Sequence, residues 1–498
     1  MQLRHLFRCL ILCPLLVLPA AAQQLSGGAA PLNVPQSLDQ LLAAGQQSPF
    51  SGSVPTDKLV PGVIEISVEE AIDRGLKYNL GIILSGQATE QAKAQRMKDL
   101  SNLLPHIDGS LRESEVKVNL LAEGFNLGAF GQQLGIHGNS VRFSNSDARI
   151  SMTEDLFDWH AIQGARASNA GVRAAGFTFS SARETVTLSV AASYLLVIAA
   201  ESEVDAATAE LKTAEALYQL AGDREQAGLS PNVDTLRALV ELQVRRQNLI
   251  EANNNLAKQR ITLRRVLGLP VRQEFKLVSR VPYRPLPVIS EDEALQRALA
   301  ARPDYLALEQ QVKAAELMKQ SAMAERYPTV GISGDYGTLG TRPDNPFPTW
   351  TVNAGLRIPV FEGGKIEADI RQAEAALKQR KAQRDDMRGR IEQDVANAIL
   401  DVNAAAEQVE VAKTTVSYAQ QTLTQSQDRF SAGVTNNIEV IQAQEALANA
   451  NQQYISSLYA HNIAKVLLAR ALGAAEQTLR RVLGDDGVPP QAPVVPAR

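Results

Sequence analysis

The chain has 498 residues, of which 45% are hydrophobic and only 5% aromatic, and its formal net charge is −4. A chain of this length usually folds as more than one domain. The charge balance is mildly acidic and no domain-sized basic patch stands out, so the composition gives no indication of a nucleic-acid partner.

The first 22 residues have the pattern of an export signal. Two arginines precede a short apolar stretch, and a run of small residues ends at Ala22. We therefore predict a signal peptide at 1–22. Both cysteines, Cys9 and Cys13, lie within it, so the exported chain must be stabilised by packing or assembly rather than by disulfides.

No other stretch reads as a run of about 18 apolar residues, and no transmembrane helix is predicted. Three locations remain open for an exported chain: the periplasm, the cell exterior, and an outer membrane entered through a β-barrel. Barrel strands alternate apolar and polar residues, so they do not register in a hydropathy scan.

The chain contains two copies of one unit. Two pairs of segments align without gaps, 223–268 with 428–473 and 66–76 with 289–299. This repetition predicts two similar domains one after the other, which we place at residues 63–280 and 281–475. The flanking segments 23–62 and 484–498 are predicted to be a disordered linker and a disordered proline-rich tail.

Each unit is predicted to run as helix, two strands, long helix, break, long helix. In the first unit the strands are expected near 106–120 and 141–156, and in the second they follow Pro328. The last strand alternates most clearly. The residues predicted to form its apolar, lipid-facing side are Trp350, Val352, Ala354, Leu356, Ile358 and Val360.

The second unit contains a helix of unusual length. Residues 365–430 contain no proline and one glycine, and as one helix they would extend roughly 100 Å. Such a helix cannot fold onto a compact core, so we expect it to lie against others of its kind. In the two units, Gly228 and Gly433 end the incoming helix, and the next helix returns antiparallel as a hairpin. Pro231 is expected at the first position of that helix, with Ser230 as its cap.

Four strands per chain cannot close a barrel. Each strand has about the length that crosses an outer membrane, yet exposed strand edges are not tolerated in lipid. The chain must therefore assemble, with a dimer of eight strands or a trimer of twelve as the simplest choices. The predicted fold class is mainly α with a membrane β-barrel and a long periplasmic α-helical barrel.

The duplicated unit, the "VFEGGKIEADI" entry to the long helix and the "DRFSAGVTNNIEVIQAQEAL" turn resemble the TolC-type outer-membrane efflux and secretion channels over roughly residues 66–475. The resemblance implies a homotrimer with a twelve-stranded barrel in the outer membrane and a helical tunnel in the periplasm. It also implies a passive exit channel that is coupled to a periplasmic adaptor and an inner-membrane transporter.

The resemblance further implies that the hairpin turns close the tunnel and contact the adaptor. Some members carry a gating arginine and an additional acid where this chain has Thr435 and Gln442, so closure here is expected to depend more on packing. The residues carried over by position are Gly228, Leu229, Ser230, Asp234, Gly433, Val434, Thr435 and Glu439.

No catalytic chemistry is predicted. The five histidines are scattered without ligand spacing, and no glycine stretch forms a phosphate-binding loop. We therefore predict no enzyme activity, no cofactor and no metal site. The alternative function is that of a periplasmic coiled-coil adaptor or scaffold without a pore, which would need the helices and the hairpin turns but not four membrane-length strands.

Overall fold

The computed structural model describes residues 49–482, except for 56–58, 60, 123, 125–139, 279–282, 287–288 and 343. The predicted signal peptide, the proline-rich tail and most of the predicted linker lie outside the described residues. So does most of the glycine-rich segment between the first two strands.

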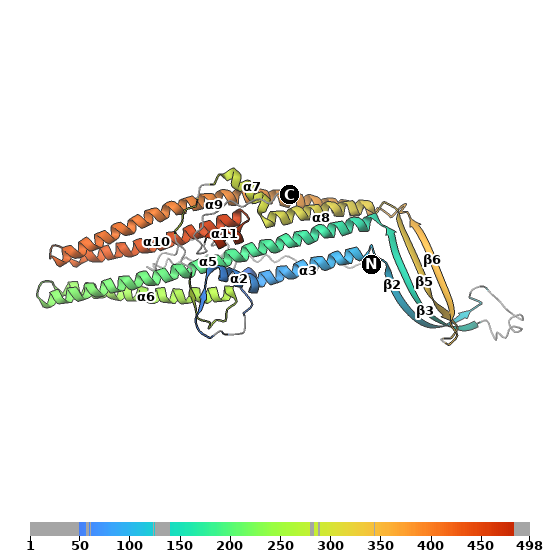
Figure 1. Cartoon of the computed structure of the whole chain (residues 1–498), viewed down its shortest axis with the longest axis horizontal. Coiled ribbons are helices and arrows are strands. Elements are labelled where there is room, and N and C mark those ends of the chain that lie inside the picture. Colours follow the sequence, from blue (N-terminus) through green and yellow to red (C-terminus); the bar gives the residue numbers. More distant parts are fainter. Residues whose placement is uncertain are drawn as a thin grey trace, which may run out of the picture. The chain divides into compact units, whose positions relative to one another are not determined.

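Four long helices dominate the fold (Figure 1). They are α5 (Trp159–Gln226), α6 (Asn232–Leu267), α9 (Lys365–Ser431) and α10 (Asn437–Ala471). With 68 and 67 residues, α5 and α9 are each roughly 100 Å long. The prediction of one continuous helix over 365–430 is confirmed.

Each repeat supplies one antiparallel pair of long helices, α5 with α6 and α9 with α10. Two shorter helices, α3 (Leu80–Ser101) and α8 (Pro303–Ala324), pack along the part of the long helices nearer the sheet. Contacts of α8 with α5, and of α10 with α5, join the two repeats. Pro303 begins α8, because proline is tolerated in the first turn of a helix but not in its interior.

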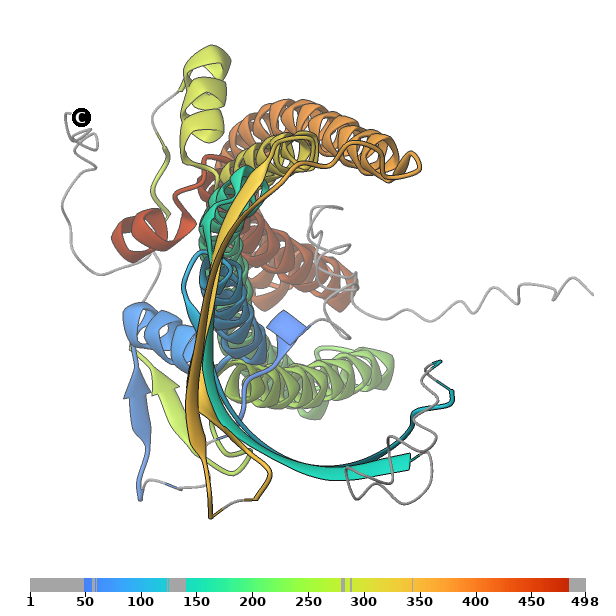
Figure 2. The same ribbon diagram turned by 90° about the vertical axis from the view of Figure 1, so that its right-hand side faces the viewer.

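Small elements cover one side of the long helices, as Figure 2 shows. They are β1 (Ile64–Ile66), α2 (Val68–Tyr78), β4 (Phe275–Leu277), α7 (Glu291–Ala301) and α11 (Ala475–Val482). Strands β1 and β4 pair in parallel. The largest core cluster lies here, where large apolar side chains such as Ile72, Leu263 and Ile463 are fully buried.

The chain forms one curled antiparallel sheet of four strands (Figure 2). It lies at the end of the long helices opposite the turns that join α5 to α6 and α9 to α10. Its strands are β2 (His106–Asn119), β3 (Ser140–Phe157), β5 (Thr329–Gly340) and β6 (Phe347–Arg357), in the order β2-β3-β5-β6. Each repeat contributes one pair of strands, and the pairing of β3 with β5 joins them. The four predicted strands are therefore confirmed.

The prediction of disorder across 23–62 is wrong for 49–55. Pro49–Ser51 forms a 3-10 turn, and Ser53 is 8% exposed and forms a β-bridge with Asn79. Phe50 packs so closely on Gly81 that a Cβ there would lie 2.1 Å from its ring. The polar composition of the segment as a whole concealed this anchored aromatic side chain.

Among the described helices, α5 contains an 18-residue window that is apolar enough to cross a membrane, contrary to the expectation that no stretch of the exported chain is. Of this window, 67% is buried inside the protein. The same residues form much of the main core, including Val186, Val190 and Tyr194. The apolar window is therefore explained by packing against neighbouring helices.

Candidate functional site: hairpin turns and amphipathic sheet

The two helix hairpins end in turns of the same geometry. Gly228 has φ 70° and Gly433 has φ 75°, values that glycine adopts without strain. The next residue then donates its N–H back to the helix, from Leu229 to Arg224 O at 2.8 Å and from Val434 to Arg429 O at 2.9 Å. The predicted role of the two glycines as helix-ending residues is therefore confirmed.

The caps of the returning helices differ from each other and partly from the prediction. Asn436 caps α10, since its side chain accepts the Ile438 N–H at 3.2 Å. Pro231, expected at the first helical position, is instead the N-cap of α6 and gives no side-chain hydrogen bond. Ser230 does not cap this helix, because its hydroxyl is buried and has no hydrogen-bond partner.

The acids predicted at the turns both lie beside arginines of their own hairpin. Asp234 is 7% exposed, and its carboxylate lies 3.4 Å from Arg237. Glu439 lies 3.4 Å from Arg429 and accepts a hydrogen bond from the Thr435 hydroxyl. Thr435, which stands where some members carry a gating arginine, therefore pairs within its own turn.

Two residues that the sequence did not single out tie the hairpins together. Arg224 donates from Nη1 to the carbonyl oxygens of Phe430 at 2.8 Å and Ser431 at 3.1 Å. Its guanidinium also lies 4.9 Å from the centre of the Phe430 ring. In the opposite direction, Asn437 donates from Nδ2 to the carbonyl oxygen of Asp234 at 3.0 Å. We call these contacts the tip clamp.

The repeat alignment shows that both hairpins carry the residue types of the tip clamp, but it does not show which copy of each residue forms it. Arg224 aligns with Arg429, and Asn437 aligns with Asn232. Arg429 and Asn232 bond within their own hairpins, to Glu439 at 3.4 Å and Glu225 at 2.7 Å. Only the folded arrangement of the two hairpins shows which copy of each residue reaches across.

Next to the turns, the first residues of α6 and α10 border an apolar groove of about 430 Å³. Several of its side chains are well exposed for large apolar residues: Val233 is 50% exposed, Leu236 52% and Val240 64%. The remaining lining residues are Arg237, Glu241, Ile438, Ile441 and Gln442. Gln442, the second position that departs from the family pattern, thus lies in this groove.

In its half nearer the helices, the four-stranded sheet has one mainly apolar face, which also carries Glu154 of β3, and one polar face. Tyr336 pairs directly with Ile150 on one side and Trp350 on the other, so the three side chains share a face. The large apolar residues on this face are between 37% and 84% exposed. They are Ile107, Leu111, Ile150, Met152, Tyr336, Trp350, Val352 and Leu356.

The predicted apolar side of the last strand is on this face up to Leu356. The strand ends at Arg357, so Ile358 and Val360 lie in the connection to α9 rather than in the strand. The alternation of residue types continued beyond the end of backbone pairing, and the sequence alone could not show where pairing stops.

The polar face carries an ion-pair cluster. Arg149 donates to both oxygens of Asp147, at 2.7 and 2.6 Å, and to Asp335 Oδ1 at 3.1 Å. Gly337 pairs with Arg149 across the strands, and a Cβ at this glycine would lie 2.5 Å from the Arg149 Cβ. Glycine is therefore required here for the two strands to approach with Arg149 between the aspartates.

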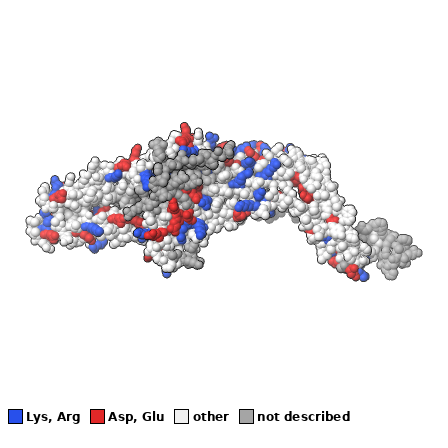
Figure 3. All heavy atoms as spheres, viewed as in Figure 1, with Lys and Arg blue, Asp and Glu red and all other residues white. Residues whose placement is uncertain are grey.

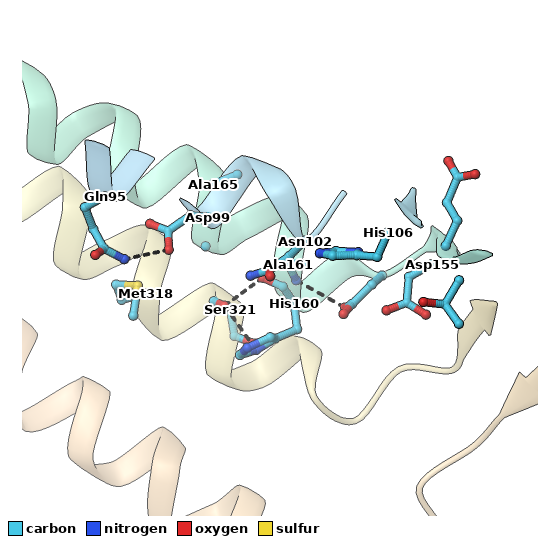
Figure 4. Close-up of a pocket in the computed structure, with 14 residues that line it drawn as sticks. Gln95, Asp99, Asn102, His106, Asp155, His160, Ala161, Ala165, Met318 and Ser321 are labelled. Atoms are coloured by element: carbon cyan, nitrogen blue, oxygen red, sulfur yellow. Dashed lines mark hydrogen bonds between the residues drawn. The ribbon is translucent and has the colours of Figure 1, made fainter. Parts of the chain in front are cut away.

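A polar cavity of about 490 Å³ lies where the sheet meets the helices (Figure 4). His160 lies 3.0 Å from the carbonyl oxygen of Ser321 through Nδ1, and Asp158 caps α5 by accepting the Ala161 N–H at 3.1 Å. Gln95 donates to Asp99 at 2.9 Å. The His160 contact joins α5 to α8 beside the strand connections, whereas the Gln95–Asp99 bond lies within α3. Among the described residues, no group of three or more His, Cys, Asp or Glu is arranged to hold a metal ion.

One ionisable pair is deeply buried in the helical part. His461 is 0% and Lys465 3% exposed, and both lie near the carbonyl oxygen of Arg284, each at 3.4 Å. Burial, together with the Arg284 charge, lowers the pKa of Lys465 to about 8. Burial and the Lys465 charge also lower the pKa of His461.

Comparison with known proteins identifies the fold and the family. The family model described as outer membrane efflux protein matches residues 85–269 and 294–474, one match in each repeat. The chain belongs to the outer membrane efflux protein family. The predicted TolC-type resemblance is confirmed, and with it the outer-membrane location and the passive channel for efflux or secretion.

Curated relatives extend over most of the chain. The pyoverdine export outer membrane protein OpmQ of Pseudomonas putida is 25% identical over 451 residues, which is 87% of this chain and 92% of the relative. The outer membrane protein TolC of Escherichia coli is 23% identical over 362 residues, 68% of this chain and 71% of the relative. Both relatives are named as outer membrane proteins, and OpmQ is named for export.

Solved channel structures share the fold. The Campylobacter jejuni CmeC outer membrane channel superimposes with a TM-score of 0.70 at 18% identity, over 82% of this chain and 86% of that chain. The open state of the Neisseria gonorrhoeae MtrE channel gives 0.69 at 19% identity, over 82% and 89%. The family match and the relatives, together with this fold, set aside the alternative of a coiled-coil adaptor without a pore.

Proposed function

We propose that this outer membrane efflux protein works as a homotrimer whose three sheets close one twelve-stranded barrel. Among the described residues of one chain, β2 and β6 each have one edge without a partner strand. Unpaired backbone groups are too costly in lipid to remain exposed. Adjacent strands in the order β2-β3-β5-β6 are antiparallel, so β6 of one copy can pair antiparallel with β2 of the next.

The distribution of side chains supports this assembly. Large apolar residues of one sheet face are exposed in the single chain, and a face of this size is expected to be covered by lipid or protein. The opposite face carries Asp147, Arg149 and Asp335. In a closed barrel the first face contacts lipid and the second lines the water-filled interior.

We place the periplasmic gate at the two hairpin turns, held closed within each chain by the tip clamp. Opening the tunnel requires the two hairpins to separate. Arg224 and Asn437 each donate to backbone carbonyls of the other hairpin. Hydrogen bonds from charged donors contribute about 1.5–3 kcal/mol each, so three chains together hold a closed gate firmly.

The energy for transport comes from partners, a periplasmic adaptor and an inner-membrane transporter. The sequence contains no phosphate-binding loop that could hydrolyse a nucleotide. Relatives of the family are named for export and secretion. The adaptor is proposed to contact the exposed turns, where Leu229 is 69% and Val434 67% exposed, and the groove above them.

Single-channel recording in planar bilayers tests the gate. Arg224→Gln removes the charged donor of the clamp, so the open probability is expected to rise about 10-fold or more, as loss of at least 1.4 kcal/mol implies. Arg429→Gln is the matched control, since Arg429 is the repeat equivalent and, among the described residues, forms its ion pair with Glu439 of its own hairpin. Equal open probabilities in the two variants would contradict the clamp. If neither the two variants nor the unaltered protein conducted ions, the channel itself would be contradicted.

A further inference from the structure

A short segment between the two repeats runs from the main core to the second helix hairpin. It follows β4 and precedes α7, and we call its described residues 283–286 the strap. At one end, Phe275 of β4 is buried in the main core. At the other end, Leu286 of the strap packs against a separate cluster formed by α7, α9 and α10. The strap therefore ties the second hairpin to the main core.

Contacts with α9 and α10 hold the strap in place. The Tyr283 hydroxyl donates to the carbonyl oxygen of Ala406 on α9 at 3.4 Å. The carbonyl oxygen of Arg284 lies 3.4 Å from His461 Nε2 and 3.4 Å from Lys465 Nζ, both on α10. The rings of Tyr283 and His461 also lie 5.0 Å apart between their centres. One backbone carbonyl of the strap is thus held by two side chains of α10.

The Arg284 carbonyl determines which nitrogen of His461 carries the hydrogen. A carbonyl oxygen can only accept, so Nε2 is the donor and Nδ1 has no hydrogen in the neutral ring. The His461 Nδ1 atom is buried and has no hydrogen-bond partner among the described residues. A second proton on this ring would create a buried N–H without an acceptor, an arrangement that folded proteins avoid.

The surroundings of His461 also oppose a positive charge. Figure 3 shows charged side chains of both signs spread over the surface of the helical part, whereas His461 and Lys465 are 0% and 3% exposed. Burial and the Lys465 charge lower the pKa of His461. Tyr283 provides no negative charge, because burial and the Glu410 charge raise the pKa of its hydroxyl. Arg284 adds a positive charge that acts on Lys465.

We infer that His461 is a pH-sensitive latch for the strap. While the ring is neutral, Nε2 donates to the Arg284 carbonyl and the strap lies against α10. A proton taken up from solution at Nδ1 places two cations one helical turn apart in a buried site. The strap then lifts so that water reaches both charges, and the second hairpin loses one of its ties to the main core.

The latch weakens as the pH falls. The pKa of His461 in the held strap lies below its ordinary value of 6.5, so the held state is fully favoured above pH 6.5 and is lost progressively below it. Lys465 keeps its proton over this range, because its own pKa is about 8. Each unit by which the His461 pKa is lowered changes the ratio of released to held strap about 10-fold.

Spin labelling of the strap tests the latch without any use of channel activity. The purified full chain, with Cys9 and Cys13 changed to Ser, carries one nitroxide at Pro285→Cys, an exposed position of the strap. The spectrum is expected to show an immobile label at pH 7.5 and a mobile component that grows several-fold as the pH falls to 5. A label that is mobile at both pH values, or a spectrum independent of pH, overturns the latch.

Two variants and a control assign this change to His461. His461→Gln keeps an amide donor for the Arg284 carbonyl but takes up no proton, so its mobile component should not grow in acid. Lys465→Met removes the neighbouring cation, which raises the pKa of His461 and shifts the midpoint of the change to higher pH. His160→Gln, whose side chain is 46% exposed, should behave like the unaltered protein. An acid response that persists in H461Q, or an unshifted midpoint in K465M, overturns the assignment.

The consequence for transport rests on the proposed gate. A second hairpin with one tie fewer separates more readily from the first, so the open probability in planar bilayers is expected to rise as the pH falls from 7.5 to 5. The rise should be smaller in His461→Gln. Equal rises in both proteins would overturn the link between latch and gate. A protein that never conducts would contradict the proposed channel, whereas the spin-label measurement would still decide the latch.

Discussion

At the scale of single residues, the described structure places a lysine where a charge is unfavourable. Lys465 is 3% exposed, and its Nζ donates a hydrogen bond to the carbonyl oxygen of Arg284 at 3.4 Å. Its pKa is lowered to about 8 from 10.5 because burial disfavours the ammonium form. Between these two values the unfolded chain binds more protons than the folded chain, so stability rises with pH through this window.

Replacing this lysine with an apolar residue is therefore expected to stabilise the protein near neutral pH. Lys465→Met should raise the thermal midpoint at pH 7, because it adds at most about 3 kcal/mol to the free energy of unfolding. This gain in stability should shrink towards pH 10. Thermal unfolding in detergent, followed by circular dichroism at both pH values, measures it. Lys413→Met at an exposed position of α9 is the control. A destabilised K465M, or an effect independent of pH, would count against this reading.

At the scale of elements, the sequence predicted the helices and strands well because their patterns are local. Alternation marked the last strand, and the absence of proline marked α9. The tip clamp was not predictable, because Arg224 reaches carbonyl groups more than 200 residues away in the chain. The predicted N-cap of α6 was wrong, because the helix begins one residue later than expected and Pro231 lies just outside it.

The hairpin turns depend on the left-handed conformation of their glycines. Gly433→Val places a β-branched side chain at φ 75°, which costs about 1–2 kcal/mol. We expect this variant to lose export in cells while the long helices and the assembly persist. Export assays together with circular dichroism and native gels measure the two effects. Gly389→Ala in the middle of α9, with open space around it, is the control and should stabilise the helix by about 1 kcal/mol. Normal export by G433V would remove the turn from the gate.

At the scale of the whole molecule, the proposed function requires several copies of the chain. Four strands provide an apolar face and a polar face, yet in the part of the chain that the structure describes both edges of the sheet lack partner strands. The long helices likewise offer exposed residues such as Val411 and Leu400, 67% and 66% exposed. Rotational symmetry would pair the edges and close the helices into a tube in a single step.

Native mass spectrometry of the detergent-solubilised protein tests this central claim most directly. The account predicts a complex with the mass of three chains, stable without added partners, because the barrel and the tunnel are completed only together. A stable particle with the mass of one chain, or of two, would contradict the twelve-stranded assembly on which the proposed channel depends.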